Sequence, residues 1–333
     1  MWDSVFKFIV KRTSVEPNYT KENCIAFKQG LTSCHICKDV CPHEAISFQR
    51  GKEVKIDDID CTGCGICVQS CPSQALEAKL NYQVGAPIKC SQVKGGAQTI
   101  QCLGRLGPSD LLRLAGTKNK ATLIRNDCAN CKIGTEAVLE NLQKNEEKAQ
   151  LLAQLKNRDF SLDIQIHDSY DAIDNPEVLS RRDLLRGGFK GLQNTAAEAL
   201  APFDPGGNDE TKLPREMQRQ YRMIASSKPE PEQLVPWILP RVGEKCILCP
   251  ICTKICPTQA FSRTFNVAEK GGTVLNLEPE KCNGCAACVR ACPVKTISLD
   301  EDISWQELSG GLQEVFFKAP RKSDDDKDGT VSR

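Results

Sequence analysis

The stretch CTGCGICVQSCP at residues 61–72 has the cysteine spacing CxxCxxCxxxCP. The same spacing recurs as CILCPICTKICP at 246–257 and as CNGCAACVRACP at 282–293. A [4Fe-4S] cubane exposes four irons at the corners of a tetrahedron, so three thiolates two residues apart can bind three corners from one loop. The fourth thiolate then comes from elsewhere in the chain. The spacing therefore predicts a cubane cluster at each of the three stretches.

A fourth stretch, CIAFKQGLTSCHICKDVCP at 24–42, keeps only part of this pattern. Cys34, Cys37, Cys41 and Pro42 stand in place, but Leu31 occupies the position of the first ligand. Cys24, further upstream, is the candidate replacement. We therefore expect a fourth cubane here, with a longer loop between its first two ligands.

Twenty cysteines in one chain also raise two other interpretations. Secreted disulfide frameworks scatter their cysteines along short chains, whereas sixteen of these fall in four tight groups. Structural zinc sites use two separated CxxC pairs, and a third cysteine followed by Cys-Pro does not serve a single tetrahedral ion. The four groups therefore favour iron–sulfur clusters.

The charge balance points to no polyanionic partner. Lys plus Arg total 44 and Asp plus Glu total 43, a net charge of +1, so no global field favours nucleic acid. No secretory signal and no apolar run long enough for a membrane span is visible, which predicts a cytoplasmic protein. Four apolar residues near the N-terminus share one helical face beside basic residues; they are Trp2, Val5, Phe6 and Ile9. This face is expected to pack on the rest of the chain, with docking to a partner or to a membrane surface as the alternative.

The residues after each Cys-Pro repeat as well: CPHEAISF, CPSQALEA, CPTQAFSR and CPVKTISL. The repeat predicts two units of two cubanes each, the first unit at 18–82 and the second unit at 240–303. In two-cluster proteins the fourth cysteine of one motif binds the cluster of the other. The predicted ligand sets are Cys24, Cys34, Cys37 with Cys71; Cys61, Cys64, Cys67 with Cys41; Cys246, Cys249, Cys252 with Cys292; and Cys282, Cys285, Cys288 with Cys256.

Between the units lies a segment of different character, here called the middle domain (83–180). Apolar runs around Ile88, Ile100, 121–124 and 162–166 predict strands, while 109–115 and 134–156 predict helices. The remaining cysteines, Cys90, Cys102, Cys128 and Cys131, follow predicted strand ends. They complete one four-ligand set and predict a fifth centre, either [2Fe-2S] or [4Fe-4S], with structural zinc and free buried thiols as the alternatives.

With these residues in view, the chain resembles polyferredoxins, the multi-cluster electron carriers attached to oxidoreductases. The first unit looks like the NapF-type ferredoxins of periplasmic nitrate reductase, which also have a distant first cysteine before a CxxCxxxC group. That resemblance supports Cys24 as a ligand. The segment IQCLGRLGPSDLLRLAGTKNKATLIRNDCANC at 100–131 is similar to the delta subunit of methyl-viologen-type hydrogenases, whose domain holds a [2Fe-2S] cluster.

Together these features predict an α+β protein, with two bacterial-type dicluster ferredoxin units, each a pseudo-twofold pair of βαβ halves, flanking a small α/β domain. The other predicted segments are an N-terminal amphipathic helix (1–17), a helical and Pro-rich linker (181–239) and a C-terminal extension with a disordered tail (304–333).

The predicted function is electron transfer, with oxidoreductase subunits as donor and acceptor. No nucleotide-binding motif or catalytic constellation is visible, so catalysis is expected only in a partner. The alternative is an accessory ferredoxin that helps to mature a molybdenum enzyme or another metalloenzyme.

Overall fold

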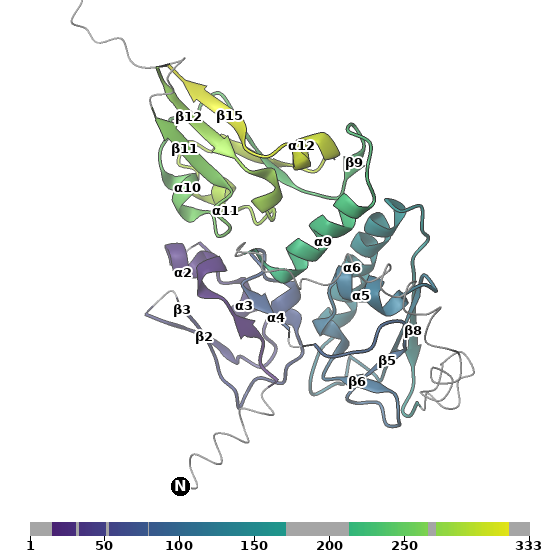
Figure 1. Cartoon of the computed structure of the whole chain (residues 1–333). Coiled ribbons are helices and arrows are strands. Elements are labelled where there is room, and N and C mark those ends of the chain that lie inside the picture. Colours follow the sequence, from purple (N-terminus) through teal and green to yellow (C-terminus); the bar gives the residue numbers. More distant parts are fainter. Residues whose placement is uncertain are drawn as a thin grey trace, which may run out of the picture.

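The computed structural model describes residues 15–30, 33–50, 53–78, 80–170, 213–265 and 271–319. The predicted N-terminal helix, most of the predicted linker and the predicted tail fall largely outside these ranges. Helices and strands are mixed throughout, as an α+β fold requires. Figure 1 shows three regions: the first unit in purple, the middle domain in teal beside it, and the second unit in green and yellow above.

The first unit consists of very short helices and two antiparallel strand pairs, β1 with β4 and β2 with β3. A proline follows the last cysteine of each motif, and neither it nor the residue before it continues a helix, which keeps these helices short. The elements are β1 (Asn18–Tyr19), η1 (Lys21–Asn23), α2 (Ile25–Gln29), α3 (Ile36–Asp39), β2 (Ile46–Gln49), β3 (Glu53–Ile56), α4 (Ile66–Gln69) and β4 (Leu76–Glu77).

The middle domain is built on a parallel four-stranded sheet in the order β6-β5-β7-β8. Its strands and helices are β5 (Ile88–Cys90), β6 (Gln98–Ile100), η2 (Leu103–Arg105), α5 (Pro108–Ala115), β7 (Lys120–Arg125), α6 (Ala137–Gln154) and β8 (Ser161–Ile166). The central strands are buried at Ile88, Leu123 and Ile124, against Leu111 of α5 and Leu142 of α6. Strands therefore occur at the predicted positions, and all point the same way, so their carboxyl ends share one edge.

The second unit pairs β10 with β13 and adds a three-stranded sheet, β11-β12-β15. Its elements are β9 (Leu234–Val235), β10 (Leu239–Val242), α10 (Ile251–Ile255), β11 (Phe261–Phe265), β12 (Thr273–Leu277), η5 (Pro279–Lys281), α11 (Ala287–Ala291), β13 (Ile297–Asp300), β14 (Ile303–Ser304), α12 (Trp305–Ser309) and β15 (Gln313–Lys318). The unit thus extends beyond the predicted end at 303, because Val315 and Phe316 of β15 pack on the cluster-bearing core.

Helix α9 (Arg215–Ser226) lies at the centre of the molecule, between the middle domain and the second unit (Figure 1). Its buried Met217 and Ile224 join a hydrophobic cluster with Leu152 of α6 and with Trp237 and Leu239 at the start of the second unit. The segment was predicted as part of a linker. Its apolar residues recur at helical spacing and are buried, so this part of the chain is packed structure.

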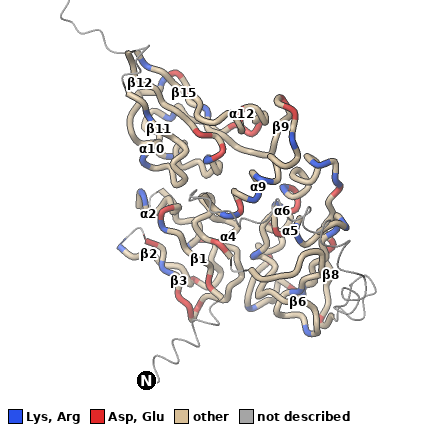
Figure 2. The backbone as a smooth tube through the Cα atoms, in the orientation of Figure 1, with Lys and Arg blue, Asp and Glu red and all other residues tan. Residues whose placement is uncertain are grey.

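The two ferredoxin units touch each other directly. Ile25 of α2, Ile255 of α10 and Ala287 of α11 form one small buried cluster. The Lys28 ammonium beside it donates a hydrogen bond of 3.0 Å to the Cys256 carbonyl oxygen. Figure 2 shows charged residues of both signs spread over all three regions, with several along α9 and beside α5 and α6. Within the described part of the chain, no helix has the length and apolar character needed to cross a membrane.

Candidate iron–sulfur sites

Each cysteine-rich loop leads into a helix of about one turn. The third cysteine of each motif lies in that helix: Cys37 in α3, Cys67 in α4, Cys252 in α10 and Cys288 in α11. The short helices therefore position the third thiol of each motif.

Backbone amides also reach the sulfur atom of the last cysteine of one motif in each unit. The Ala75 and Ala260 amides donate to the Sγ atoms of Cys71 and Cys256, both at 3.2 Å. Amide-to-sulfur hydrogen bonds are one of the means by which a protein sets the reduction potential of a cluster.

The structure brings Cys24 to the same place as Cys34, Cys37 and Cys71. Burial raises the pKa of Cys37 to about 12, and the neighbouring Cys71, Cys24 and Cys34 add to the shift. Cys24 is itself buried, between η1 and α2. The predicted replacement for the missing first ligand thus lies beside the other three members of its set.

The second set of the first unit surrounds a cavity. Cys41, Cys61, Cys64 and Cys67 line a small cavity of about 20 Å³. Burial raises the pKa of Cys67, and the nearby Cys64 and Cys61 contribute. In the second unit Cys256, Cys282, Cys285 and Cys288 line a similar cavity of about 20 Å³.

The remaining predicted ligand set consists of Cys246, Cys249, Cys252 and Cys292, and fewer contacts in the structure define it. Burial raises the pKa of Cys252 to about 11, with Cys249 and Cys246 as further causes, so these three lie together. Cys292 packs, with Cys246, against the hydrophobic cluster that contains Cys252. The structure therefore places the predicted fourth ligand in the same core.

The four middle-domain cysteines also gather around one cavity, of about 20 Å³. Cys90 ends β5, Cys102 follows β6, and Cys128 and Cys131 lie in the loop after β7. All four are thus at the carboxyl edge of the parallel sheet. The cavity is about as large as those lined by the cysteines of the two ferredoxin units.

These surroundings fit iron–sulfur clusters. Buried thiols with raised pKa values stay protonated unless a positively charged group offsets the cost of burying thiolates. An iron–sulfur core carries positive charge and binds four thiolates, so it supplies that compensation. Among the described residues, the cysteines of these sets included, no three or more His, Cys, Asp or Glu side chains form a group that could hold a metal ion as the side chains stand.

Two residues near these sites were not singled out as site residues from the sequence. A Cβ atom on Gly65, whose φ is +83°, would stand 2.7 Å from the Arg105 Cα atom. The buried Arg105 guanidinium donates to the Val15 carbonyl at 2.9 Å, and Cys61 and Cys102 lie close to it. Arg105 belongs to the CLGR string at 102–105, whose resemblance to the hydrogenase subunit was the available signal.

Comparison with known proteins agrees with this picture for the two outer units. The family model of the 4Fe-4S dicluster domain matches residues 32–75 and residues 245–296. Cys24 precedes the first match, and the middle-domain cysteines lie between the two. Searches of curated proteins and of solved structures find no match. The two matched regions support ferredoxin-type 4Fe-4S dicluster domains in both outer units, and with them an iron–sulfur electron-transfer protein.

Proposed function

We propose that the chain is a polyferredoxin in which five centres form one line from the middle domain to the far end of the second unit. Four would be [4Fe-4S] clusters held by the predicted sets of motif cysteines, including Cys24. The fifth would be an iron–sulfur cluster held by Cys90, Cys102, Cys128 and Cys131. Each such cluster takes up and releases one electron.

One observation carries this proposal: neighbouring cysteine sets meet at every junction of the line. Cys64 of the first unit lies close enough to Cys102 to contribute, after burial, to the raised pKa of that thiol, about 12. Gly104, next to Cys102 and Leu103, is so near the Cys64 carbonyl that a Cβ atom there would stand 2.8 Å away. The middle set therefore borders the set of Cys41, Cys61, Cys64 and Cys67.

The other junctions follow in turn. Within the first unit, Cys37 is among the neighbours that raise the pKa of Cys67, after burial. Between the units, Cys34 and Cys285 pack against the small hydrophobic cluster of Ile25, Ile255 and Ala287.

Within the second unit, burial and nearby cysteines, Cys252 among them, raise the pKa of Cys288 to about 12. The proposed order therefore begins at Cys128 and Cys131 and ends at the set of Cys246, Cys249 and Cys252.

The two ends of the line are the proposed contacts for a donor and an acceptor protein. Ile247, between two predicted ligands of the last set, exposes about half of its surface, 52%. At the other end, Asp127 and Asn130 lie exposed in the loop that carries Cys128 and Cys131. We propose oxidoreductase subunits as partners, a cytoplasmic location, and no substrate chemistry in the chain itself.

The order can be tested by EPR spectroscopy of the anaerobically reconstituted, fully reduced chain. Adjacent reduced clusters couple magnetically, so the wild type should show coupling across the whole line. Cys37→Ala removes the inner centre between the two units. The magnetic coupling of the second unit to the middle domain and to the centre held by Cys61 should then be lost. Cys249→Ala removes an end and should leave four coupled centres. Identical spectral changes in both variants would contradict the order.

A further inference from the structure

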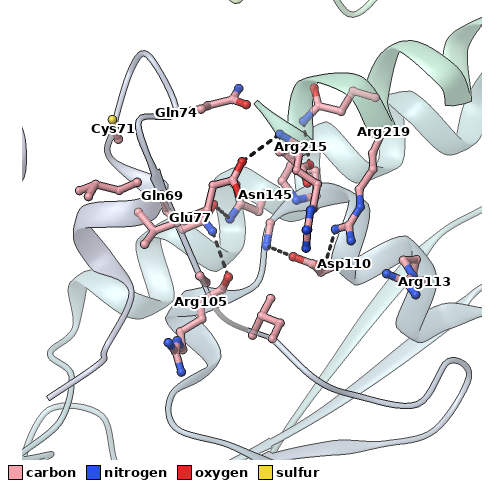
Figure 3. A pocket seen from close by; sticks show the side chains of 18 of the residues that line it. Gln69, Cys71, Gln74, Glu77, Arg105, Asp110, Arg113, Asn145, Arg215 and Arg219 are labelled. Carbon is pink, nitrogen blue, oxygen red and sulfur yellow. Dashed lines mark hydrogen bonds and ion pairs between the residues drawn. The ribbon is translucent and has the colours of Figure 1, made fainter. Parts of the chain in front are cut away.

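A cavity of about 210 Å³ lies where the first unit, the middle domain and α9 meet. Its walls come from the ends of α4 and β4, the start of α5, the middle of α6 and the first turns of α9. In Figure 3 the side chains of Arg215 and Arg219 come from α9 toward Asp110, with Arg113 and Asn145 nearby. The electron-transfer proposal assigns no role to this cavity.

The acidic side chains of the cavity already have partners. Asp110 accepts hydrogen bonds from Tyr82 at 2.5 Å and from the Gly107 amide at 3.0 Å, and it pairs with Arg219 at 3.1 Å. Glu77 accepts from the Arg215 amide at 2.9 Å.

Glu216 is likewise satisfied. It accepts from the Ser109 amide at 3.0 Å and from the Gln220 side chain at 2.8 Å, and also from the Ser109 hydroxyl. The acceptors of the cavity are therefore largely used within the protein.

Three basic side chains of the cavity lack such hydrogen-bond partners among the described residues. Arg113 of α5, Lys148 of α6 and Arg215 of α9 make no side-chain hydrogen bond or ion pair with any residue that the structure describes. The Arg113 Nε atom is buried without a partner, and its guanidinium lies 5.5 Å from the centre of the Tyr82 ring. Burial lowers the pKa of Lys148, and the nearby Glu216 opposes this shift without offsetting it, so this ammonium also bears a desolvation cost.

The cavity has more unused hydrogen-bond donors than unused acceptors, so it favours a ligand that only accepts hydrogen bonds. Guanidinium and ammonium groups from three different helices suit an oxyanion, because each can direct an N–H group at a separate oxygen atom. The volume is below the range of about 300–1,000 Å³ that is usual for drug-sized ligands. We propose that this cavity binds a small tetrahedral oxyanion, either free or as the phosphate group of a small ester, between Arg113, Lys148 and Arg215.

The position of the cavity gives this binding a consequence for electron transfer. Cys71, a proposed ligand in the first unit, is part of the cavity wall. An anion bound here would disfavour reduction of the centre that Cys71 holds, since reduction adds negative charge. By reciprocity, reduction would weaken anion binding. This consequence rests on the proposed function, whereas the binding itself does not.

Isothermal titration calorimetry on the full-length, anaerobically reconstituted chain tests the site. The titrants are inorganic phosphate, sulfate and glycerol 3-phosphate, with chloride at equal ionic strength as the reference. We expect saturable binding at one site per chain for at least one oxyanion and none for chloride. A preference for glycerol 3-phosphate over inorganic phosphate would identify an ester, and the opposite preference a free ion.

Two variants connect binding to the cavity. Lys148→Met keeps most of the side-chain volume and should weaken binding about tenfold or more, as expected for loss of a hydrogen bond to a charged group. Lys144→Met changes the same residue type one turn earlier on α6, at an exposed position outside the cavity, and should leave affinity within about twofold.

A third variant tests whether weaker binding could instead result from misfolding. Arg215→Gln, at the exposed start of α9, should weaken binding as Lys148→Met does. Absence of saturable oxyanion binding, or equal weakening by Lys144→Met and Lys148→Met, would overturn the proposal. Loss of binding with intact cluster spectra would leave the electron-transfer proposal standing.

Discussion

Replacing Gly65 by alanine tests the contact between the first unit and the middle domain. Gly65 adopts a φ of +83°, and its new Cβ atom would stand 2.7 Å from the Arg105 Cα atom and 2.8 Å from the Arg105 nitrogen. Because Arg105 backbone cannot rotate away as a side chain does, the two regions must separate slightly. The chain offers a matched control in Gly85, which has a φ of +70° and nothing within 4 Å of its added Cβ atom.

The expected magnitude follows from two contributions. A left-handed backbone costs an alanine about 1–2 kcal/mol, and both variants carry this penalty. Overpacking adds about 1–3 kcal/mol in Gly65→Ala alone. At about 2–4 °C per kcal/mol, Gly65→Ala should melt about 2–12 °C below Gly85→Ala.

The assay is anaerobic thermal unfolding, followed by visible circular dichroism of the clusters. In the same Gly65→Ala samples, EPR coupling between the first unit and the middle domain should weaken. Equal melting temperatures for Gly65→Ala and Gly85→Ala would refute the close contact of Gly65 with Arg105, and with it the first junction of the proposed line.

Three further results are expected. Iron analysis after anaerobic reconstitution should give about 18–20 irons per chain, from four cubanes and a fifth cluster; a plateau near eight irons, or stoichiometric zinc, would contradict the assignment. Cys24→Ser should remove one cubane or leave a three-iron cluster, since an iron without its thiolate is labile, and unchanged iron and EPR would exclude Cys24 as a ligand. Burial raises the pKa of Glu216, and the nearby Asp110 adds to the shift. The contribution of Glu216 to the stability of the wild type is therefore fully present below the ordinary carboxyl pKa. This contribution is lost as pH rises through the raised pKa of the folded state. Glu216→Gln cannot ionise, so its melting temperature should rise relative to that of the wild type as pH increases from the ordinary carboxyl pKa through the raised pKa of Glu216, and parallel curves would contradict this reasoning.

The grouping of the cysteines around each expected cluster could be predicted from the sequence. The irons of a cubane have fixed positions, so the cysteines that bind them must have a fixed spacing in the chain. The apolar runs also predicted the strands of the middle domain, which the structure contains as β5, β6, β7 and β8. Parallel strands end at one edge, so the meeting of Cys90 with Cys128 could be expected from the pattern alone.

The relations between the regions could not be predicted in the same way. The contact between the two ferredoxin units depends on single apolar residues, Ile25 and Ile255, which carry no periodic signal. β15 joins its sheet through long-range pairing with β12. The Pro-rich stretch predicted a short helix where α9 lies, but not the burial of that helix against α6 and the second unit. The anion cavity has walls from residues as distant as Cys71 and Arg219, so only the folded chain brings its basic groups together.

The most direct test of the proposed polyferredoxin is the number of electrons that one chain accepts. Coulometric reductive titration of the anaerobically reconstituted protein measures this number without any partner enzyme. Five centres predict an uptake of about five electrons per chain, one for each cluster. An uptake of four or fewer from a fully iron-loaded chain would contradict a line of five centres.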